Sequence, residues 1–357
     1  MRSEEIFRIA VLPGDGIGPE VIAEGIKILR TVEHDLKNIR FELKEFSVGA
    51  ETYLRCGDPL PPETLENCRE QDVILLGAMG LPNVRWPDGL EMTPQIDLRE
   101  QLDLYCGLRP CYLYQADLSP LKSLIAGQID FLIIRESTEG LFSGRLNRIQ
   151  PGATEVNDQM TISQEGSERI FRAAFREAMS RKKRLSLVDK ANILPSMAFF
   201  RGIFDKVSQE FPEVETEKLY VDAASLYLVE RPESFDVIVT ENMFGDILSD
   251  LAAALVGGLG MAPSADVGNE CAVFQPAHGS APDIAGENLA NPVATILSVA
   301  LMLDWLGHTE TKRGAALIRQ AITQVLDKPG NRTRDLGGHL STVDMGNRIK
   351  NELLRLL

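Results

Sequence analysis

The sequence predicts an α/β protein with a partly parallel sheet, because apolar segments of strand length alternate with longer helical patterns. The run 72–80 is continuously apolar, as in a strand buried on both faces. We expect strands at 7–13, 41–49, 72–80, 131–137, 184–190 and 235–242. We expect helices at 19–33, 165–181, 196–210, 241–260, 291–306, 311–327 and 342–357.

The length and the helical C-terminal part predict two domains, one of them discontinuous. A chain of 357 residues exceeds the size at which one hydrophobic core usually suffices. The last hundred residues are mostly helical and need a sheet to pack on, which the N-terminal strands provide. We therefore expect residues 1–104 plus 257–357 to form one domain and residues 105–256 an inserted second one.

Composition excludes several function classes. A formal net charge of −15 argues against a nucleic-acid or anionic-membrane partner. No apolar run approaches the ~18 residues of a membrane span, and no signal peptide is visible at the N-terminus. The five cysteines are scattered and match no common zinc motif, which favours reduced thiols in a cytoplasmic protein.

Two acids in the helical pattern 241–260 form the first candidate site. Asp246 and Asp250 are four residues apart, so both carboxylates lie on one helix face. The pattern contains no Lys or Arg that could neutralise them. A divalent metal would do so, because hard cations take carboxylate oxygens. A solvated surface acid explains the same pattern equally well.

Three arginines and a lysine lie in apolar surroundings. Arg99, Arg109 and Arg135 each follow or interrupt an apolar stretch, and a buried arginine needs an anionic partner. Each one alone is explained by a structural ion pair. Together they indicate a pocket for a di- or tricarboxylate, and Lys190, which ends a predicted strand, is a candidate catalytic amine.

Two loops are rich in small residues and are candidate ligand-binding segments. The segment 14–18 (GDGIG) begins like a dinucleotide fingerprint, but Pro19 replaces its third glycine, so a strand-to-helix turn is the favoured interpretation. The segment 278–292 could wrap closely around a ligand, with His278 and Asp283 as polar contacts, or be an ordinary solvated loop.

Eight motifs spread along the chain carry a family resemblance. They are LPGDGIGPEV (12–21), LRPCYLY (108–114), IIRESTEG (133–140), VDKANIL (188–194), YVDAASLYLV (220–229), GDILSDLAAAL (245–255), HGSAPDIAG (278–286) and NPVATILSVALMLDWLG (291–307). Together they resemble the β-decarboxylating dehydrogenases that act on 3-isopropylmalate, isocitrate, homoisocitrate, tartrate and D-malate. The similarity is greatest to 3-isopropylmalate dehydrogenase, and it implies that family's two-domain fold with a mixed sheet.

The resemblance assigns roles to residues already singled out. The three arginines match those that bind the malate carboxylates. Asp246 and Asp250 match ligands of Mg²⁺ or Mn²⁺, and Asp222 matches a third, supplied by the other subunit of a homodimer. Lys190 matches the residue that accepts the hydroxyl proton across the same interface, and Asp222 counts with it among the catalytic residues.

The resemblance also implies NAD as the cofactor. The family's adenosine-binding residues match His278, Gly279, Ser280, Ala281, Asp283 and Asn291. A carboxylate at Asp283 can accept hydrogen bonds from both ribose hydroxyls and would repel a 2′-phosphate. The implied reaction is oxidation of a hydroxyacid, hydride transfer to NAD and loss of CO₂. Residues 1–104 plus 257–357 would bind NAD, and residues 105–256 would bind substrate and metal and form the dimer.

One position departs from the family pattern. The usual general acid is a tyrosine, where this chain has Phe142. Water or another side chain, such as Tyr227 or Tyr112, could replace it. Alternatively, the enzyme oxidises without efficient decarboxylation, or the chain is a weakly active or regulatory paralogue.

The resemblance implies that the residues just before Arg99 contact the 3-substituent of the substrate. Where 3-isopropylmalate enzymes place a leucine, this chain has Gln95, and Thr93 lies two residues earlier. Both are polar, which argues against a purely hydrophobic pocket, although Ile96 could add an apolar contact. We therefore expect a 3-substituted malate, with isopropyl, hydroxyl, hydrogen and carboxymethyl as open alternatives.

Overall fold

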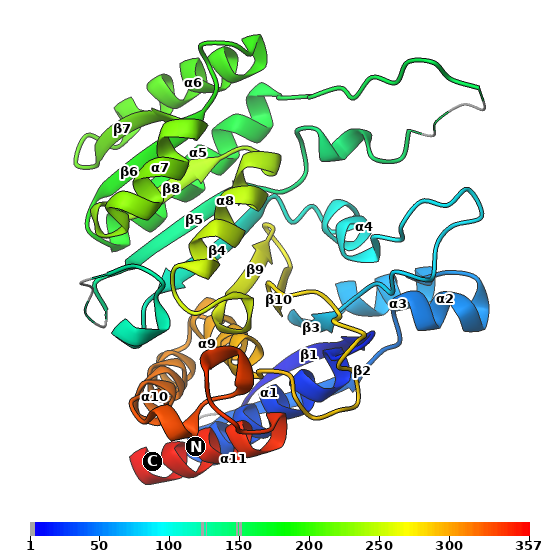
Figure 1. Cartoon of the computed structure of the whole chain (residues 1–357), viewed down its shortest axis with the longest axis vertical. Coiled ribbons are helices and arrows are strands. Elements are labelled where there is room, and N and C mark those ends of the chain that lie inside the picture. The colour runs from blue at the N-terminus through cyan, green and yellow to red at the C-terminus, as the bar shows by residue number, and fades with distance from the viewer. Residues whose placement is uncertain (1–3, 123–124, 126, 148, 150–151) are drawn as a thin grey trace.

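The computed structural model describes residues 4–122, 125, 127–147, 149 and 152–357, and its centre is one ten-stranded mixed sheet (Figure 1). The strand order is β2-β1-β3-β10-β9-β4-β5-β8-β6-β7. The strands are β1 (Glu5–Gly14), β2 (Ile39–Glu45), β3 (Val73–Ala78), β4 (Cys106–Tyr112), β5 (Asp130–Glu136), β6 (Arg184–Asp189), β7 (Glu215–Tyr220), β8 (Val237–Thr240), β9 (Pro263–Val267) and β10 (Ala272–Pro276).

Helices cover both faces of this sheet. The α-helices are α1 (Gly18–Glu33), α2 (Ala50–Cys56), α3 (Pro62–Arg69), α4 (Pro94–Gln101), α5 (Gln164–Ser180), α6 (Pro195–Val207), α7 (Val221–Glu230), α8 (Asn242–Ala254), α9 (Val293–Trp305), α10 (Thr309–Leu326) and α11 (Thr342–Leu356). Short 3₁₀ helices are η1 (Ala116–Leu118), η2 (Phe142–Gly144), η3 (Ser208–Glu210), η4 (Pro232–Ser234), η5 (Leu259–Met261), η6 (Pro329–Asn331) and η7 (Arg334–Leu336).

The sheet joins two parallel sets of strands through an antiparallel middle. Strands β2, β1, β3 and β10 are mutually parallel, as are β5, β8, β6 and β7. Between them β9 runs antiparallel to β10 and β4, and β4 antiparallel to β5. The pairing of β4 with β9 connects the two sets through only the registers Cys106–Leu108 and Ala265–Val267.

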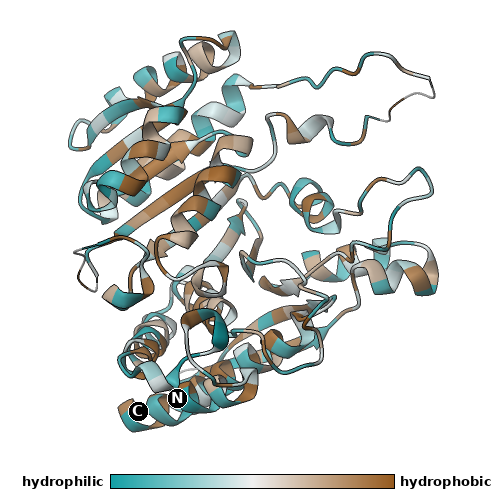
Figure 2. Cartoon of the chain, in the orientation of Figure 1, coloured by the Kyte–Doolittle hydropathy of each residue, from teal (hydrophilic) through white to brown (hydrophobic). Residues whose placement is uncertain are grey.

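The hydrophobic cores divide along the same line. One large cluster packs α1, α9, α10 and α11 against β1, β3 and β10. Near the other end, alternate residues of the strands face opposite layers: Leu187 and Val239 pack toward α5 and α6, whereas Val188 and Ile238 pack toward α7 and α8. Figure 2 shows hydrophobic residues along the central strand β5 and hydrophilic ones along the edge strand β7.

The predicted α/β class and mixed sheet are confirmed, with corrections to individual elements. Strands β4, β7, β9 and β10 were not expected from the sequence. β4 contains a glycine, an arginine and a proline, which obscure a strand pattern. The helix predicted at 241–260 ends at Ala254, because Gly257 and Gly258 adopt positive φ angles that end it.

Two further expectations concern the cysteines and membrane-spanning helices. All five cysteines are free, as the sequence suggests. Of the helices within the described ranges, none has the length and apolar character needed to cross a membrane.

Candidate active site

A cavity of about 240 Å³ lies at the centre of the sheet, where the two parallel sets meet. Its walls come from α4, β4, β5, η2, α8 and the segment after β10. Nine residues singled out from the sequence line it: Gln95, Ile96, Arg99, Arg109, Arg135, Asp246, Asp250, His278 and Gly279, and Phe142 joins them. The fold thus brings together the arginines and the helix acids, which are far apart in the sequence.

Asp266, which the sequence analysis did not single out, holds two of the arginines. Arg99 Nε donates to Asp266 Oδ2 at 2.9 Å, and Arg109 Nη2 to Asp266 Oδ1 at 3.2 Å. Burial alone would raise the pKa of this fully buried carboxyl, but Arg109, Arg99 and Arg135 hold it at about 2. Two arginines paired with one buried aspartate leave positive charge for an anionic ligand.

Arg135 links β5 to the helix that carries the two acids. Its Nε and Nη2 donate to Asn242 Oδ1 at 2.9 and 2.7 Å, and its Nη1 forms an ion pair with Asp246. Burial and the neighbouring Arg99 lower its pKa to about 10. Gly245 permits this close approach, because a Cβ there would lie 2.7 Å from Arg135 Cβ.

Asp246 and Asp250 lie on the same face of α8 and line the cavity. The helix itself carries no cation that could neutralise them, as the sequence indicated. Arg135 on β5 supplies one, as the partner of Asp246. Burial and the charge of Asp246 raise the pKa of Asp250. An under-compensated carboxylate pair of this kind fits a divalent cation, although no group of three His, Cys, Asp or Glu side chains suited to a metal occurs among the described residues.

Lys190 and Asp222 form a separate pair. Lys190 Nζ lies 2.5 Å from Asp222 Oδ1, at the end of β6 and the start of α7. This bond lowers the pKa of Asp222, whose side chain is 68% exposed. Neither residue lines the cavity of its own chain. Within one chain, therefore, this pair is not assembled with Asp246 and Asp250.

The loop after β10 packs against the turn at 14–18. Ile17 N donates to Ser280 O at 2.8 Å, and Ser280 Oγ donates to Gly80 O. A Cβ on Gly16 would lie 2.0 Å from Ser280 O, so this contact requires glycine. The strand-to-helix turn predicted there is confirmed, since β1 ends at Gly14 and α1 begins at Gly18.

The remaining residues of this loop differ in their surroundings. His278 lines the cavity, and its buried Nε2 has no hydrogen-bond partner among the described residues. Ala281 has a positive φ of 36°, and Asp283 is exposed to solvent. Asn291 is already engaged, because its Nδ2 donates to Asp335 Oδ2 at 2.9 Å and its Oδ1 accepts from Val293 N at 3.1 Å.

Comparison with known proteins gives the family. The model of the isocitrate/isopropylmalate dehydrogenase family matches residues 8–349. The chain belongs to this family.

Relatives of the isocitrate/isopropylmalate dehydrogenase family match nearly end to end. The chain is 45% identical to the 3-isopropylmalate dehydrogenase of Moorella thermoacetica, over 98% of this chain and 99% of that one. It is 42% identical to that of Aquifex aeolicus, over 98% of both. The solved isocitrate dehydrogenase of Methylococcus capsulatus superposes with a TM-score of 0.87 at 32% identity, covering 97% of this chain and 99% of that one. A β-decarboxylating dehydrogenase from Thermococcus kodakarensis gives 0.81 at 36%, over 98% and 97%.

The structure defines the surroundings of Phe142, which stands where the family pattern has a tyrosine. Phe142 lines the cavity with its ring 5.3 Å from the guanidinium of Arg135. Of the two tyrosines considered as substitutes, Tyr112 lies in a groove on the opposite face of the sheet, and Tyr227 of α7 stacks with Arg231 just after that helix. No tyrosine is among the described residues that line the cavity.

The two residues before Arg99 have different positions. Thr93 immediately precedes α4 and does not line the cavity, whereas Gln95 does. Gln95 Oε1 is buried without a hydrogen-bond partner among the described residues. A buried acceptor left unpaired costs free energy, so this oxygen is suited to a ligand that donates to it.

Sequence reasoning missed several polar residues of the cavity. Asp266 and Asn242 position arginines, and Ser249, Ser264 and Gln275 line the wall. Asp266 could have been found, because an acid flanked by small and apolar residues needs a cationic partner just as the arginines need an anionic one. The sequence around Asn242 gives no comparable indication of a partner.

Proposed function

We propose that the chain catalyses the NAD- and divalent-metal-dependent oxidation and decarboxylation of a 3-substituted malate, in the manner of 3-isopropylmalate dehydrogenase. The observation that carries this proposal is the convergence of Arg99, Arg109 and Arg135 with Asp246 and Asp250 in one cavity. The full-length similarity to enzymes of that name supports it.

The arginines would bind the two carboxylates of the malate core. Asp266 and Asn242 fix the side chains of the three arginines before substrate arrives, so little conformational entropy is lost on binding. Arg135 is the most buried of them and is already paired with Asp246. Arg99 and Arg109 share the single carboxylate of Asp266, so a substrate carboxylate beside them would balance the remaining charge.

Asp246 and Asp250, with Asp222 of a second copy of the chain, would hold Mg²⁺ or Mn²⁺. A bound divalent ion polarises the substrate's oxygen atoms and stabilises the negative charge that develops during decarboxylation. The carboxylate donor set and the raised pKa of Asp250 support a cation at this point.

Lys190 of the second copy would accept the proton of the substrate hydroxyl. Its ion pair with Asp222 orients the amine, and the same pair would approach the cavity of the neighbouring subunit. NAD, when bound, would take the hydride and leave the keto acid. Because Phe142 has no proton to give, protonation after loss of CO₂ would depend on water or on a side chain from the second copy.

NAD would bind to the loop 278–291, with Asp283 accepting hydrogen bonds from the ribose hydroxyls. His278 lines the cavity, and its Nε2 has no hydrogen-bond partner among the described residues. A cofactor in contact with this side chain would lie next to the hydroxyacid. This division of tasks corresponds to an NAD-binding domain of residues 1–104 plus 257–357 and an inserted substrate and dimerisation domain of residues 105–256. The separate hydrophobic clusters support it.

A homodimer would form through α7 and α8. Leu226 and Val229 on α7 and Ile247 on α8 are large apolar side chains exposed on the single chain. Helices with exposed apolar residues of this kind bury them on association. The five free thiols agree with a cytoplasmic enzyme.

A polar 3-substituent is the second candidate. The unpaired Gln95 Oε1 in the cavity wall would accept a hydrogen bond from a hydroxyl substituent, as in tartrate. Ile96, which also lines the cavity, favours an apolar group such as isopropyl. Isocitrate and D-malate remain alternatives within the same reaction class, and a regulatory role without turnover is the alternative outside it.

The test is an NADH-formation assay with Mn²⁺ over 3-isopropylmalate, isocitrate, tartrate and D-malate, each with NAD and NADP. Turnover of at least one compound with NAD is the expected result. Binding of these compounds without turnover of any of them would contradict the proposed activity and favour the regulatory role. Substrate preference should shift toward 3-isopropylmalate in Gln95→Leu if Gln95 reads the substituent.

A further inference from the structure

A second, larger cavity lies behind the active-site cavity, on the opposite face of the same strands. This groove has a volume of about 660 Å³, within the range of small-molecule sites. Successive side chains of a strand point to opposite faces. Leu108 on β4, Pro263 on β9 and Phe274 on β10 line the groove, whereas their direct neighbours Arg109, Ser264 and Gln275 line the active-site cavity.

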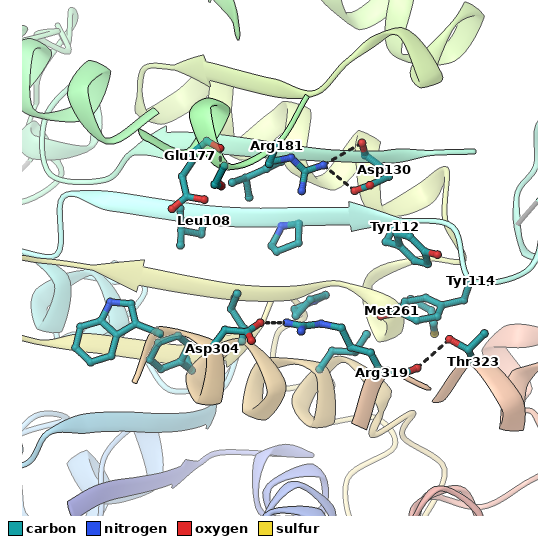
Figure 3. A pocket seen from close by; sticks show the side chains of 18 of the residues that line it. Leu108, Tyr112, Tyr114, Asp130, Glu177, Arg181, Met261, Asp304, Arg319 and Thr323 are labelled. Atoms are coloured by element: carbon teal, nitrogen blue, oxygen red, sulfur yellow. Dashed lines mark hydrogen bonds and ion pairs between the residues drawn. The ribbon is translucent and has the colours of Figure 1, made fainter. Parts of the chain in front are cut away.

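The groove has an apolar floor and, at one end, the carboxylate of Glu177 (Figure 3). Leu297, Leu301 and Trp305 of α9 form one wall, with the Trp305 ring 6.0 Å from that of Phe274. Figure 3 shows Glu177 reaching from α5 toward β4 at one end of the groove. At the other end stand Tyr112 and Tyr114, whose rings are 4.8 Å apart.

The other charged side chains of the groove are already paired. Arg181 binds Asp130 and Asp236 at 2.7 and 2.9 Å, and Arg319 pairs with Asp304. Among the described residues, none donates a hydrogen bond to the Glu177 carboxylate or forms an ion pair with it. Burial raises its pKa, and the attraction of Arg181 opposes this only in part. A cationic ligand would remove this electrostatic cost.

We propose that the groove binds a small organic amine with a flat apolar body, its ammonium on Glu177 and its body against Leu301 and Trp305. Its occupation is transmitted to the hydroxyacid cavity. The groove is walled by α5 on one side and by α9 and α10 on the other, and the halves of the sheet meet at the short β4–β9 pairing. Rotation about that joint narrows one cavity as it widens the other.

An amine that fills the groove keeps it from narrowing and so opposes opening of the active-site cavity. The KM for the hydroxyacid therefore falls when the groove is occupied, by about fivefold, a typical coupling between two sites. This coupling rests on the proposed function, whereas binding of the amine does not.

Calorimetric titration of the full-length protein tests the site with tryptamine, which carries an ammonium on an indole, and with indole-3-acetate, which carries a carboxylate instead. We expect saturable binding of one tryptamine per chain and weaker binding of indole-3-acetate. Glu177→Gln should weaken tryptamine by about tenfold and remove most of the difference between the two probes. Glu165→Gln, on the exposed first turn of the same helix, is the matched control and should change neither.

Four results would overturn the proposal. Absence of saturable tryptamine binding or equal binding by the Glu177→Gln variant would exclude the groove as an amine site. Displacement of tryptamine by saturating hydroxyacid would place it in the active-site cavity instead. An unchanged KM with tryptamine bound would overturn the coupling. If no malate analogue is turned over, the proposed function fails, while the titration still decides whether the groove binds amines.

Discussion

Asp266 Oδ1 lies 3.2 Å from Arg109 Nη2, although 157 residues separate them in the chain. The same carboxylate binds Arg99 through its other oxygen at 2.9 Å. Asp266 lies on β9 and Arg109 on β4, the two strands that join the parallel sets of the sheet. The anion that orders the arginines is therefore part of the joint itself.

Replacing Asp266 tests this arrangement through the pH dependence of stability. The folded-state pKa of about 2 lies below the ordinary value of 3.8. Its contribution is therefore complete above pH 3.8 and is lost as the pH falls toward 2. We expect Asp266→Asn to lower the free energy of unfolding at pH 7 by about 3 kcal/mol, because two buried arginines lose their partner.

Urea unfolding of both proteins between pH 6 and 2 provides the measurement. The difference between wild type and variant should shrink toward the acid end. Asp283→Asn, which removes an exposed acid of the same type, should unfold like the wild type. A difference that stays constant down to pH 2 would show that Asp266 does not act through its charge.

The Asp250→Asn variant tests the metal site, and its thermal stability reports separately on folding. We expect metal-dependent turnover to fall by at least about 100-fold, because a carboxylate ligand is lost. Thermal stability without metal should be unchanged or higher, since the variant relieves the repulsion between Asp246 and Asp250. Mn²⁺ binding followed by electron paramagnetic resonance should weaken in parallel. Normal Mn²⁺ affinity in the variant would rule Asp250 out as a ligand.

Subunit mixing tests whether the active sites are shared. Lys190→Ala and Asp250→Asn should each inactivate a homodimer. In a mixed dimer, one site would combine the intact Lys190 of one copy with the intact Asp250 of the other. Random co-assembly makes half of the dimers mixed and gives about a quarter of the wild-type activity. If co-expression restores nothing above the single variants, the two residues do not come from different chains.

Phe142→Tyr tests the protonation step. The added hydroxyl would lie in the cavity beside Arg135 and supply the proton donor that the wild type lacks there. General-acid catalysis of this kind contributes about 100-fold or more. If the missing acid makes decarboxylation inefficient in the wild type, CO₂ released per NADH should rise toward unity in the variant, with KM little changed. An identical ratio in both proteins would show that water or another group already performs this step.

The sequence by itself determined the α/β class, most of the helices and several of the charged residues that line the central cavity. These rest on local signals: periodicity of apolar residues, glycines at turns, and charged residues in apolar surroundings. The position of α1 after the turn at 14–18 follows from such a signal. So does the presence of two acids on one face of α8.

Only the tertiary structure decided which of these residues meet. Strands β4 and β9 carry the glycine, proline and buried charges of the joint, so their pattern resembles that of loops. They become strands by pairing with each other and with their outer neighbours β5 and β10. Because the pairing of β4 with β9 is long-range, the contact of Asp266 with the arginines could not be predicted locally. The position of Arg135 beside Asp246 depends in the same way on the long-range pairing of β5 with β8. The pairing of β4 with β9 also separates the active-site cavity from the groove behind it, since alternate side chains of one strand serve two different faces.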